Sequence, residues 1–438
     1  MVAGRSKTYS LAPKKELRGG ILTKLNRQQV LGFWASWFGW TLDGMDSVIY
    51  ALVLAPAMRE LLPRSGMAAT PANVAFAGSI LFALFLMGWG LSFLWGPIAD
   101  RFGRARCLAA TILVFSVFTG AAALAQDVYQ LGLFRFLAGI GIGGEWAMAG
   151  TYVAEAWPED RRKQGAGFLQ TGYYAGFFLA AALNYTVGAS LGWRAMFLCG
   201  GIPVLVTLFT LARVREPERW KAHHAGATIR PLAMIFSATY LRRTIVNTAL
   251  VSIAIIGLWA GSVYEPTALI TLAHKAGLSV LDGTRMASLG TAILSVGTIL
   301  GCLLLPVLAE RIGRKTTLAL YFCGMAVTIA LSFGWAFYLK DGLRPFLIIL
   351  FFLGFAGGNF AMFSLWLPEQ YPTEIRATAF AFCTSFGRFL GAGANFAIAG
   401  LIQWWGSLGS VIALTAIPFV IGLAVIPFAL ETKGKPLP

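Results

Sequence analysis

Residues 96–106 read Gly96-Pro97-Ile98-Ala99-Asp100-Arg101-Phe102-Gly103-Arg104-Ala105-Arg106, a short charged turn between two long apolar stretches. About 210 residues further on, a weaker copy reads Pro306-Val307-Leu308-Ala309-Glu310-Arg311-Ile312-Gly313-Arg314-Lys315. Each copy contains an acid and an Arg, then one residue, Gly and Arg. Equivalent turns in two halves predict a duplicated membrane protein. We expect the charged turns to act as a hinge or latch on one face of the bilayer.

The composition places the chain in a membrane. Of its 438 residues, 57% are hydrophobic and 12% are charged, about half the charge of an average soluble protein. Residues 1–27 are basic and lack an early apolar core, so we expect a cytosolic tail rather than a signal peptide. The net charge of +16 does not indicate nucleic-acid binding, because most cations lie in alternate loops.

The chain shows no pattern that is typical of an enzyme or of a metal site. Its five Cys residues are scattered through apolar stretches, and its three His residues lie in loops. Neither a catalytic triad nor an ATP-binding loop stands out. We therefore expect no cofactor, no metal and no enzymatic activity.

Twelve apolar stretches are long enough to cross a ~30 Å hydrocarbon core, which takes roughly 20 residues each. They predict an all-α membrane protein with twelve transmembrane helices in two six-helix bundles. Only the seventh is interrupted, by Glu265-Pro266. The expected helices are 30–52, 74–96, 107–125, 129–152, 166–190, 195–213, 244–265, 286–308, 316–338, 345–367, 377–402 and 409–430.

The predicted bundles occupy residues 28–213 and 244–430, with a charged linker at 214–243 and tails at 1–27 and 431–438. A short surface helix is expected within Leu232 to Tyr240. About 26 of the 35 Lys and Arg lie in the tails and in every second loop, so the positive-inside rule predicts that both termini are cytoplasmic. Short loops favour a bacterial inner membrane, and we expect the protein to function as a monomer.

The repeat extends beyond the turns. Residues 155–158 (Glu-Ala-Trp-Pro), followed by Arg162, match residues 369–372 (Glu-Gln-Tyr-Pro), followed by Arg376, at an offset of 214. With the charged turn, the Gly-rich stretch from Arg135 to Gly144 resembles the signatures of the major facilitator superfamily. Residues 42–46 (Leu-Asp-Gly-Met-Asp), 143–146 (Gly-Gly-Glu-Trp) and 151–158 (Thr-Tyr-Val-Ala-Glu-Ala-Trp-Pro) are similar to the sialate:proton symporter family. The resemblance implies the major facilitator fold and transport of sialic acid, lactate or related carboxylates.

Charges inside a membrane are costly unless they are paired or hydrated, and five lie well inside predicted helices: Asp43, Asp46, Arg135, Glu145 and Arg388. Asp43 and Asp46 share one helix face. Asp46 lies roughly 24 Å above the inner end of its helix and Arg135 roughly 9 Å below the outer end of its own. These depths agree, so we expect an Asp46–Arg135 pair.

The predicted pair is suited to proton coupling, because a carboxylate stays ionised beside Arg and takes up a proton when the Arg or water leaves. Residues 44–47 also resemble the helix-1 proton site of sugar porters, whose partner is the Arg that matches Arg135. We expect Asp46 to carry the proton, with Asp43 as the second candidate. The alternative is a permanent ion pair that only joins two helices.

Arg388 lies near mid-membrane without an acid on its own helix, where the other half has Tyr174. A carboxylate cargo would complete this pair, since guanidinium binds carboxylate in a bidentate way. Alternatively, Arg388 pairs with a carboxylate of another helix, such as Glu145. Glu145 itself is a candidate second proton site or inner-gate residue, or it bonds to a neighbouring helix. The Gly residues around it favour close helix packing.

Further polar and aromatic residues are expected to line the cavity, although buried amides often only join helices: Gln170, Tyr173, Tyr174, Asn184, Trp259, Asn359 and Asn395. Charges of the turns and of the repeated motifs are expected to close the cytoplasmic side, unless they only set the topology: Asp100, Arg101, Arg104, Arg162, Glu310, Arg314 and Arg376. The family resemblance implies that Asp100 could cap or pair with the start of a helix in the other half, and Glu310 with Arg376 would repeat the arrangement of the first half. Because Glu310 replaces Asp, we expect latches of unequal strength.

The sequence thus predicts a secondary transporter that takes up a small organic acid anion together with a proton, by alternating access. Lactate and sialic acid are the expected types of cargo. Three alternatives stay open at this point: a sugar or polyol proton symporter, a drug/proton efflux antiporter, and a membrane receptor or scaffold that does not transport.

Overall fold

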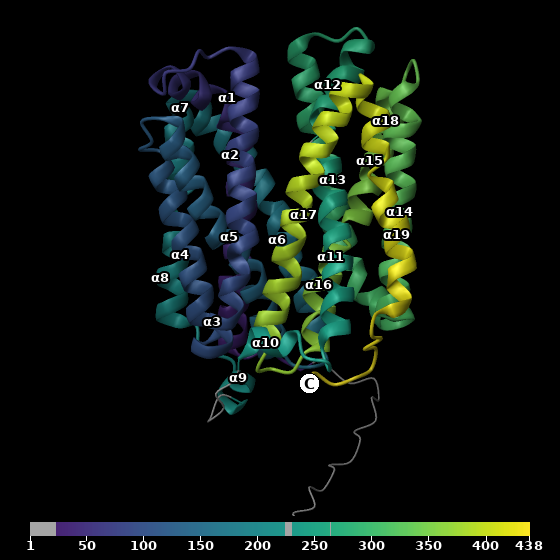
Figure 1. Ribbon diagram of the computed structural model, residues 1–438. Coiled ribbons are helices and arrows are strands. Elements are labelled where there is room, and N and C mark those ends of the chain that lie inside the picture. Colours follow the sequence, from purple (N-terminus) through teal and green to yellow (C-terminus); the bar gives the residue numbers. More distant parts are fainter. Residues whose placement is uncertain (1–22, 224–229, 263) are drawn as a thin grey trace, which may run out of the picture.

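The computed structural model describes residues 23–223, 230–262 and 264–438 (Figure 1). In this part of the chain all regular structure is helical. The helices of the N-terminal half are α1 (Arg27–Arg64), α2 (Pro71–Leu91), η1 (Ser92–Leu94), α3 (Trp95–Phe102), α4 (Arg104–Ala122), α5 (Val128–Ala156), α6 (Arg162–Leu183), η2 (Asn184–Gly188), α7 (Ala189–Cys199) and α8 (Val204–Arg213).

Two short helices follow, α9 (Glu218–His223) and α10 (Pro231–Ile235). The second covers only the start of the surface helix expected at 232–240. The C-terminal half contains α11 (Leu241–Ser262), α12 (Glu265–Lys275), α13 (Val280–Ile312), α14 (Arg314–Gly334), η3 (Ala336–Tyr338), α15 (Leu343–Gly357), α16 (Phe360–Trp366), η4 (Pro368–Gln370), α17 (Arg376–Trp405), α18 (Leu408–Ala413), α19 (Ala416–Val425) and η5 (Ile426–Phe428).

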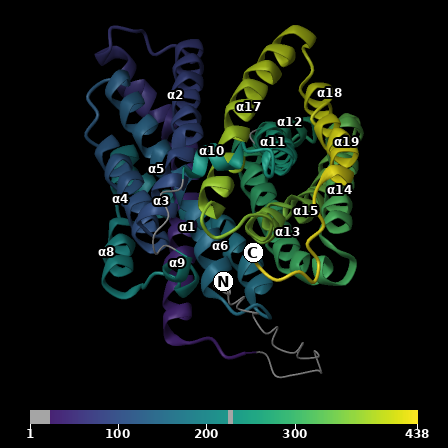
Figure 2. The same cartoon turned by 60° about the horizontal axis from the view of Figure 1, so that its bottom comes forward.

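The predicted fold of twelve spans in two six-helix bundles is confirmed, and the bundles stand side by side in Figures 1 and 2. Some spans are broken rather than continuous. The sixth consists of α7 and α8, and the tenth of α15 and α16, which are separated by Gly358 and Asn359. The seventh divides into α11 and α12 near Pro266, as the Glu265-Pro266 interruption suggests. Eight helices in the described residues are long and apolar enough to cross a membrane.

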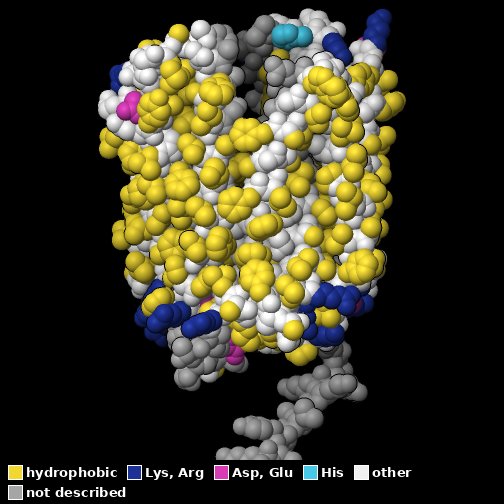
Figure 3. All heavy atoms as spheres, viewed as in Figure 1, with side chains coloured by type: hydrophobic (Ala, Val, Ile, Leu, Met, Phe, Trp, Pro, Cys, Tyr) yellow, Lys and Arg dark blue, Asp and Glu magenta, His cyan; other side chains and the backbone are white. Residues whose placement is uncertain are grey.

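Apolar side chains form a broad belt across the face seen in Figure 3, and Lys and Arg gather mainly at its lower edge. This edge contains the two charged turns, α9, α10 and the C-terminal residues, and we call it the latch face (Figure 1). The belt includes exposed residues of both halves, such as Phe76 and Val420. Because such a surface is stable only in lipid, the protein is a multi-pass integral membrane protein.

Each charged turn is built around a Gly whose positive φ is readily adopted only by a residue without Cβ. Gly103 joins α3 to α4 with φ 117°, and Gly313 joins α13 to α14 with φ 93°. At each turn a distant carboxylate caps the following helix: Glu216 accepts from the N–H groups of residues 104–106 at 2.6–3.1 Å. Glu431 accepts from Arg314 and Lys315, both at 3.1 Å.

The Glu431 carboxylate lies beyond the last membrane span. Burial acts to raise its pKa, but the backbone N–H groups that donate to it, those of Lys315 and Arg314 foremost, outweigh burial and lower the pKa below its usual range. The capping carboxylate is therefore charged at neutral pH, and its negative charge stabilises the N-terminus of α14.

Within each bundle, glycines let helices approach to backbone contact. A Cβ on Gly139 of α5 would lie 2.3 Å from the carbonyl oxygen of Phe85 in α2, and one on Gly88 of α2 would lie 2.0 Å from that of Phe136. A Cβ on Gly143 or Gly144 would likewise overlap side chains of neighbouring helices, such as those of Trp89 and Trp95. The glycines of the fourth span therefore serve close packing.

We predict that Gly139→Ala lowers the free energy of unfolding by at least about 1–3 kcal/mol, because the new methyl group overlaps the backbone of α2. The same substitution at Gly400, where a Cβ meets nothing within 4 Å, is the matched control. It should be neutral or slightly stabilising. Thermal unfolding of the two purified variants measures the difference, and equal stability would show that α2 and α5 do not cross this closely.

Candidate functional site

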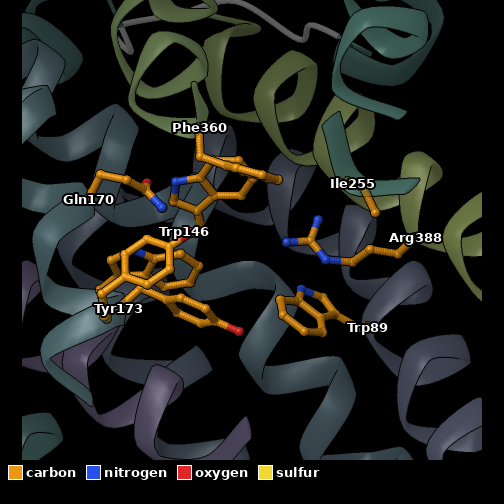
Figure 4. Close-up of a pocket in the computed structure, with 9 residues that line it drawn as sticks. Trp89, Trp146, Gln170, Tyr173, Ile255, Phe360 and Arg388 are labelled. Atoms are coloured by element: carbon orange, nitrogen blue, oxygen red, sulfur yellow. The ribbon is translucent and has the colours of Figure 1, made fainter. Parts of the chain in front are cut away.

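A cavity lies between the two bundles. Its lining residues come from α1, α2, α5 and α6 of one half and from α11, α16 and α17 of the other (Figure 4). The space measures about 320 Å³, including the part open to solvent. It is lined by Trp40, Trp89, Trp146, Gln170, Tyr173, Tyr174, Ile255, Phe360 and Arg388. Six of these nine side chains are aromatic and one is charged, so the cavity offers flat apolar walls and a single cation.

Arg388 supplies that cation from the middle of α17. Its guanidinium points into the space beside Trp89 and Trp146 (Figure 4), with its Cζ 4.1 Å and 5.5 Å from their ring centroids. One Nη donates to the main-chain oxygen of Thr384, and Nε has no hydrogen-bond partner. The side chain forms no ion pair with any carboxylate among the described residues, Glu145 included. Arg388 is thus a buried cation held only by π faces and one carbonyl.

Asp46 and Arg135 form the ion pair expected from their depths. Nη1 of Arg135 donates to both carboxylate oxygens of Asp46 at 3.1 Å, and both side chains are fully buried. The guanidinium also lies over the rings of Tyr50 and Phe85, at 4.9 Å and 4.3 Å. The charge of Asp46 is therefore compensated in this conformation.

Asp43 and Glu145 have no such compensation. Both are fully buried, and none of their four carboxylate oxygens has a hydrogen-bond partner among the described residues. The carboxyl of Glu145 packs against Gly39, one helical turn before Asp43. The two carboxyl groups therefore lie at the same face of α1. Asp43 also lies within electrostatic reach of Arg135 and Arg388. Two neighbouring buried carboxyls without partners are tolerated best when they are protonated.

The other candidate lining residues divide into four groups. Gln170, Tyr173 and Tyr174 line the cavity. Asn359 is buried in the break between α15 and α16, where it donates to Ala356, and it is not among the lining residues. The side chains of Trp259 and Asn395 lie outside the described part of the structure. Asn184, half-buried, begins the π-helical turn η2.

Below the cavity, towards the latch face, the halves are joined by hydrogen bonds. The indole N–H of Trp146 donates to Ser364 of α16 at 3.0 Å. The hydroxyls of Ser92 and Ser385 lie 2.8 Å apart. All four residues are buried. These contacts join the two halves between the cavity and the latch face.

The first latch closes on the other half, as a cap of α17. The Asp100 carboxylate accepts from the N–H groups of Ala377 and Thr378 at 3.2 and 2.8 Å, and from the Thr378 hydroxyl at 2.5 Å. It also pairs with Arg104 at 2.8 Å. Asp100 is thus buried with four partners.

The second latch is more exposed. Glu310 pairs with Arg314 at 2.9 Å, and its ion pair with the other half, among the described residues, is with Lys163 at 2.8 Å. Its side chain is 32% exposed, against 1% for Asp100. The two latches therefore differ in geometry.

Two glutamates connect these latches in a symmetric network. Glu155 pairs with Arg104 of its own half at 3.2 Å and with Arg376 of the other at 2.7 Å. Glu369 pairs in the same way with Arg314 at 2.9 Å and with Arg162 at 3.2 Å. Each carboxylate thus bridges the halves at the latch face.

Two expectations about the latches were wrong. Arg376 does not meet Glu310, because it crosses to Glu155 in the other half. Arg101 takes no part in the network, because it projects outward and its guanidinium lies over Phe102. Glu155 and Glu369 were missed as site residues, although both belong to the repeated motif at offset 214. The aromatic lining by Trp89 and Trp146 was missed too, since no sequence signal separates these rings from packing aromatics.

The chain belongs to the Major Facilitator Superfamily, whose pattern matches residues 30–394. It is 31% identical over 425 residues, 93% of this chain and 92% of the relative, to a probable 4-methylmuconolactone transporter of Cupriavidus pinatubonensis. It is 28% identical over 197 residues, 45% of this chain and 46% of the relative, to the sialic acid transporter NanX of Escherichia coli. The family resemblance inferred from the motifs is confirmed.

Other relatives at 25–28% identity are named as niacin, cis,cis-muconate and gentisate transporters. Among solved structures, the proton:xylose symporter XylE superposes with a TM-score of 0.76, at 21% identity, over 94% of this chain and 98% of that one. At this identity the likeness shows the shared fold. The chain is therefore a transporter rather than an enzyme, and its relatives carry small organic acids.

We predict that Asp100→Asn lowers the free energy of unfolding by about 2–4 kcal/mol, because the buried Arg104 then loses one of its two carboxylate partners. Glu310→Gln is the control and should cost about 0–1 kcal/mol, since that side chain is partly exposed. Chemical denaturation of both variants in detergent provides the comparison. Similar losses for the two would contradict the inequality of the latches.

Proposed function

We propose that this protein takes up a small carboxylate with a flat ring or conjugated chain, together with a proton. The observation that carries the proposal is Arg388, a buried cation in the cavity between the bundles without a carboxylate partner among the described residues. A guanidinium in this position gains two charge-assisted hydrogen bonds when a carboxylate enters. A neutral sugar would leave the cation uncompensated.

The shape of the cavity supports the class of acid. Its walls are mostly aromatic, and its one charged side chain is Arg388. Trp89 and Trp146 flank the guanidinium, so a ring attached to the bound carboxylate would lie between aromatic faces. The relatives named for methylmuconolactone, niacin and gentisate support the same chemistry. Lactate offers no ring to these walls.

For the proton, the geometry favours Asp43 over Asp46. Asp46 already has Arg135 as its counter-charge. Both carboxylate oxygens of Asp43, by contrast, lack a hydrogen-bond partner among the described residues, and Asp43 lies within electrostatic reach of Arg388. An acid bound at Arg388 consumes the positive charge that could keep Asp43 ionised, and this favours its protonated form. Glu145 is the second member of the same carboxyl pair. Asp46 and Arg135 then hold α1 against α5 beside the pair.

In the proposed cycle, the latch face is cytoplasmic and the structure is closed on that side. Acid and proton enter from the opposite face, and the Asp100 and Glu310 latches then open so that both are released inside. Symport suits an anion, since an interior-negative potential of 100 mV opposes one uncompensated negative charge by roughly 2.3 kcal/mol. We infer a location in a bacterial inner membrane, with both termini inside, and function as a monomer.

The docking residue can be tested by binding. Arg388→Gln should weaken binding of benzoate or nicotinate about 10- to 100-fold, because a hydrogen bond to a charged group is lost. Arg285→Gln, an exposed cation paired with Asp282, is the control and should bind normally. Ligand-dependent thermal shifts of the purified proteins report affinity. Unchanged binding in Arg388→Gln, or a shift produced by xylose but by neither acid, would exclude the proposal.

The proton site can be tested by separating exchange from accumulation. In proteoliposomes, Asp43→Asn should keep the exchange of labelled benzoate between the two sides but lose accumulation driven by a pH gradient. Asp46→Asn leaves Arg135 buried without its partner and should destabilise the protein by about 3–5 kcal/mol. If Asp43→Asn still accumulates benzoate like the wild type, the proton travels elsewhere.

A further inference from the structure

One face of α17 follows the second span from the cavity to the latch face. Residues 388, 385, 381 and 378 of α17 have the spacing of one helix face. They meet residues 89, 92, 96 and 100 of α2, η1 and α3 in reverse order. The contact at the cavity level is Arg388 over Trp89, and the contact at the latch face is Thr378 with Asp100. One continuous helix thus carries both the cargo residue and the latch.

Between these two levels the contact is polar at one place, the hydroxyls of Ser92 and Ser385. Ser92 donates its proton to the main-chain oxygen of Trp89 at 2.6 Å. Its oxygen is therefore the acceptor, and the Ser385 hydroxyl is the donor at 2.8 Å. Ser92 also begins η1, the 3-10 turn between α2 and α3, and such turns within a helix often mark hinges. The hydroxyl pair thus joins Trp89, under the cargo cation, to α17.

The pseudo-equivalent interface, between α6 and α13, lacks this arrangement. By the repeat offsets, Ser385 corresponds to Thr171 and Ser92 to Cys302. Thr171 donates to Phe168 of its own helix and accepts from Trp37, while the thiol of Cys302 faces the main-chain oxygen of Gly358 in its own half. Neither of these contacts joins the halves.

The same asymmetry holds at both ends of the interface. Tyr174 stands where α17 has Arg388, and the partly exposed Glu310 stands where the second span has the buried Asp100. The cargo cation, the hydroxyl pair and the stronger latch therefore all belong to the interface of α17 with the second span.

We propose that Ser92 and Ser385 are positioning residues that link occupancy of the cavity to the Asp100 latch. This rests on the proposed docking of an acid at Arg388. A carboxylate there draws the guanidinium away from Trp89 and loosens one end of the interface. About ten residues of straight helix, roughly 15 Å, carry that displacement past Ser385 to Thr378.

The test is hydrogen exchange of residues 92–104 and 376–388 in the full-length protein, with and without benzoate. Without acid, Ser385→Ala and Ser92→Ala should each speed exchange of these segments about fivefold, the effect of one lost hydrogen bond. The double variant should add little to the single ones, because both remove the same contact. Ser332→Ala is the matched control, since its buried hydroxyl bonds only within its own helix.

With benzoate, the wild type should exchange faster in the latch segments, whereas Ser385→Ala should no longer respond although it still binds the acid. Exchange rates equal to those of Ser332→Ala, or a full benzoate response in Ser385→Ala, would overturn the role of the serines and leave the proposed function standing. A wild type that shows no thermal shift with benzoate or nicotinate would instead contradict the proposed function. The exchange rates without acid would still test the hydroxyl pair.

Discussion

Arg388 keeps a positive charge inside the protein with only two aromatic faces and one carbonyl to stabilise it. A buried ion without a counter-ion costs several kcal/mol, so this arrangement persists only if something compensates the charge during part of the cycle. Other buried cations of the structure have a carboxylate: Arg135 has Asp46, and Arg104 has both Asp100 and Glu155. We therefore propose that the carboxylate of the cargo serves as the counter-ion of Arg388.

The two halves share their framework but differ where chemistry is required. At the latch face the repeat is preserved, since Glu155 and Glu369 each bridge two arginines from opposite halves. At the cavity it is not preserved, because Arg388 occupies the position at which the other half has Tyr174. A symmetric network lets the bundles rock as two similar bodies. The asymmetric cavity gives one interface the means to respond to an anion.

Local geometry made part of this site predictable. Asp46 and Arg135 could be matched in depth, because a helix rises by a fixed 1.5 Å per residue. Asp100 was expected to cap a helix of the other half, and it caps α17. Other contacts between bundles were not predictable in this way. Arg376 meets Glu155 rather than Glu310, because the choice depends on how two bodies dock and not on the spacing along one helix. The chain has 13% aromatic residues. The sequence therefore does not distinguish Trp89 and Trp146, which line the cavity, from aromatic residues that face lipid.

The central claim is that a carboxylate completes Arg388. A structure of the protein with 4-bromobenzoate, located by the anomalous signal of bromine, tests it directly. We expect the carboxylate within hydrogen-bond distance of the Arg388 guanidinium, the ring between Trp89 and Trp146, and the bromine on the far side of the cavity from Arg388. An acid bound elsewhere, or an Arg388 that pairs with Asp43 or Glu145 while the acid occupies the cavity, would contradict the account.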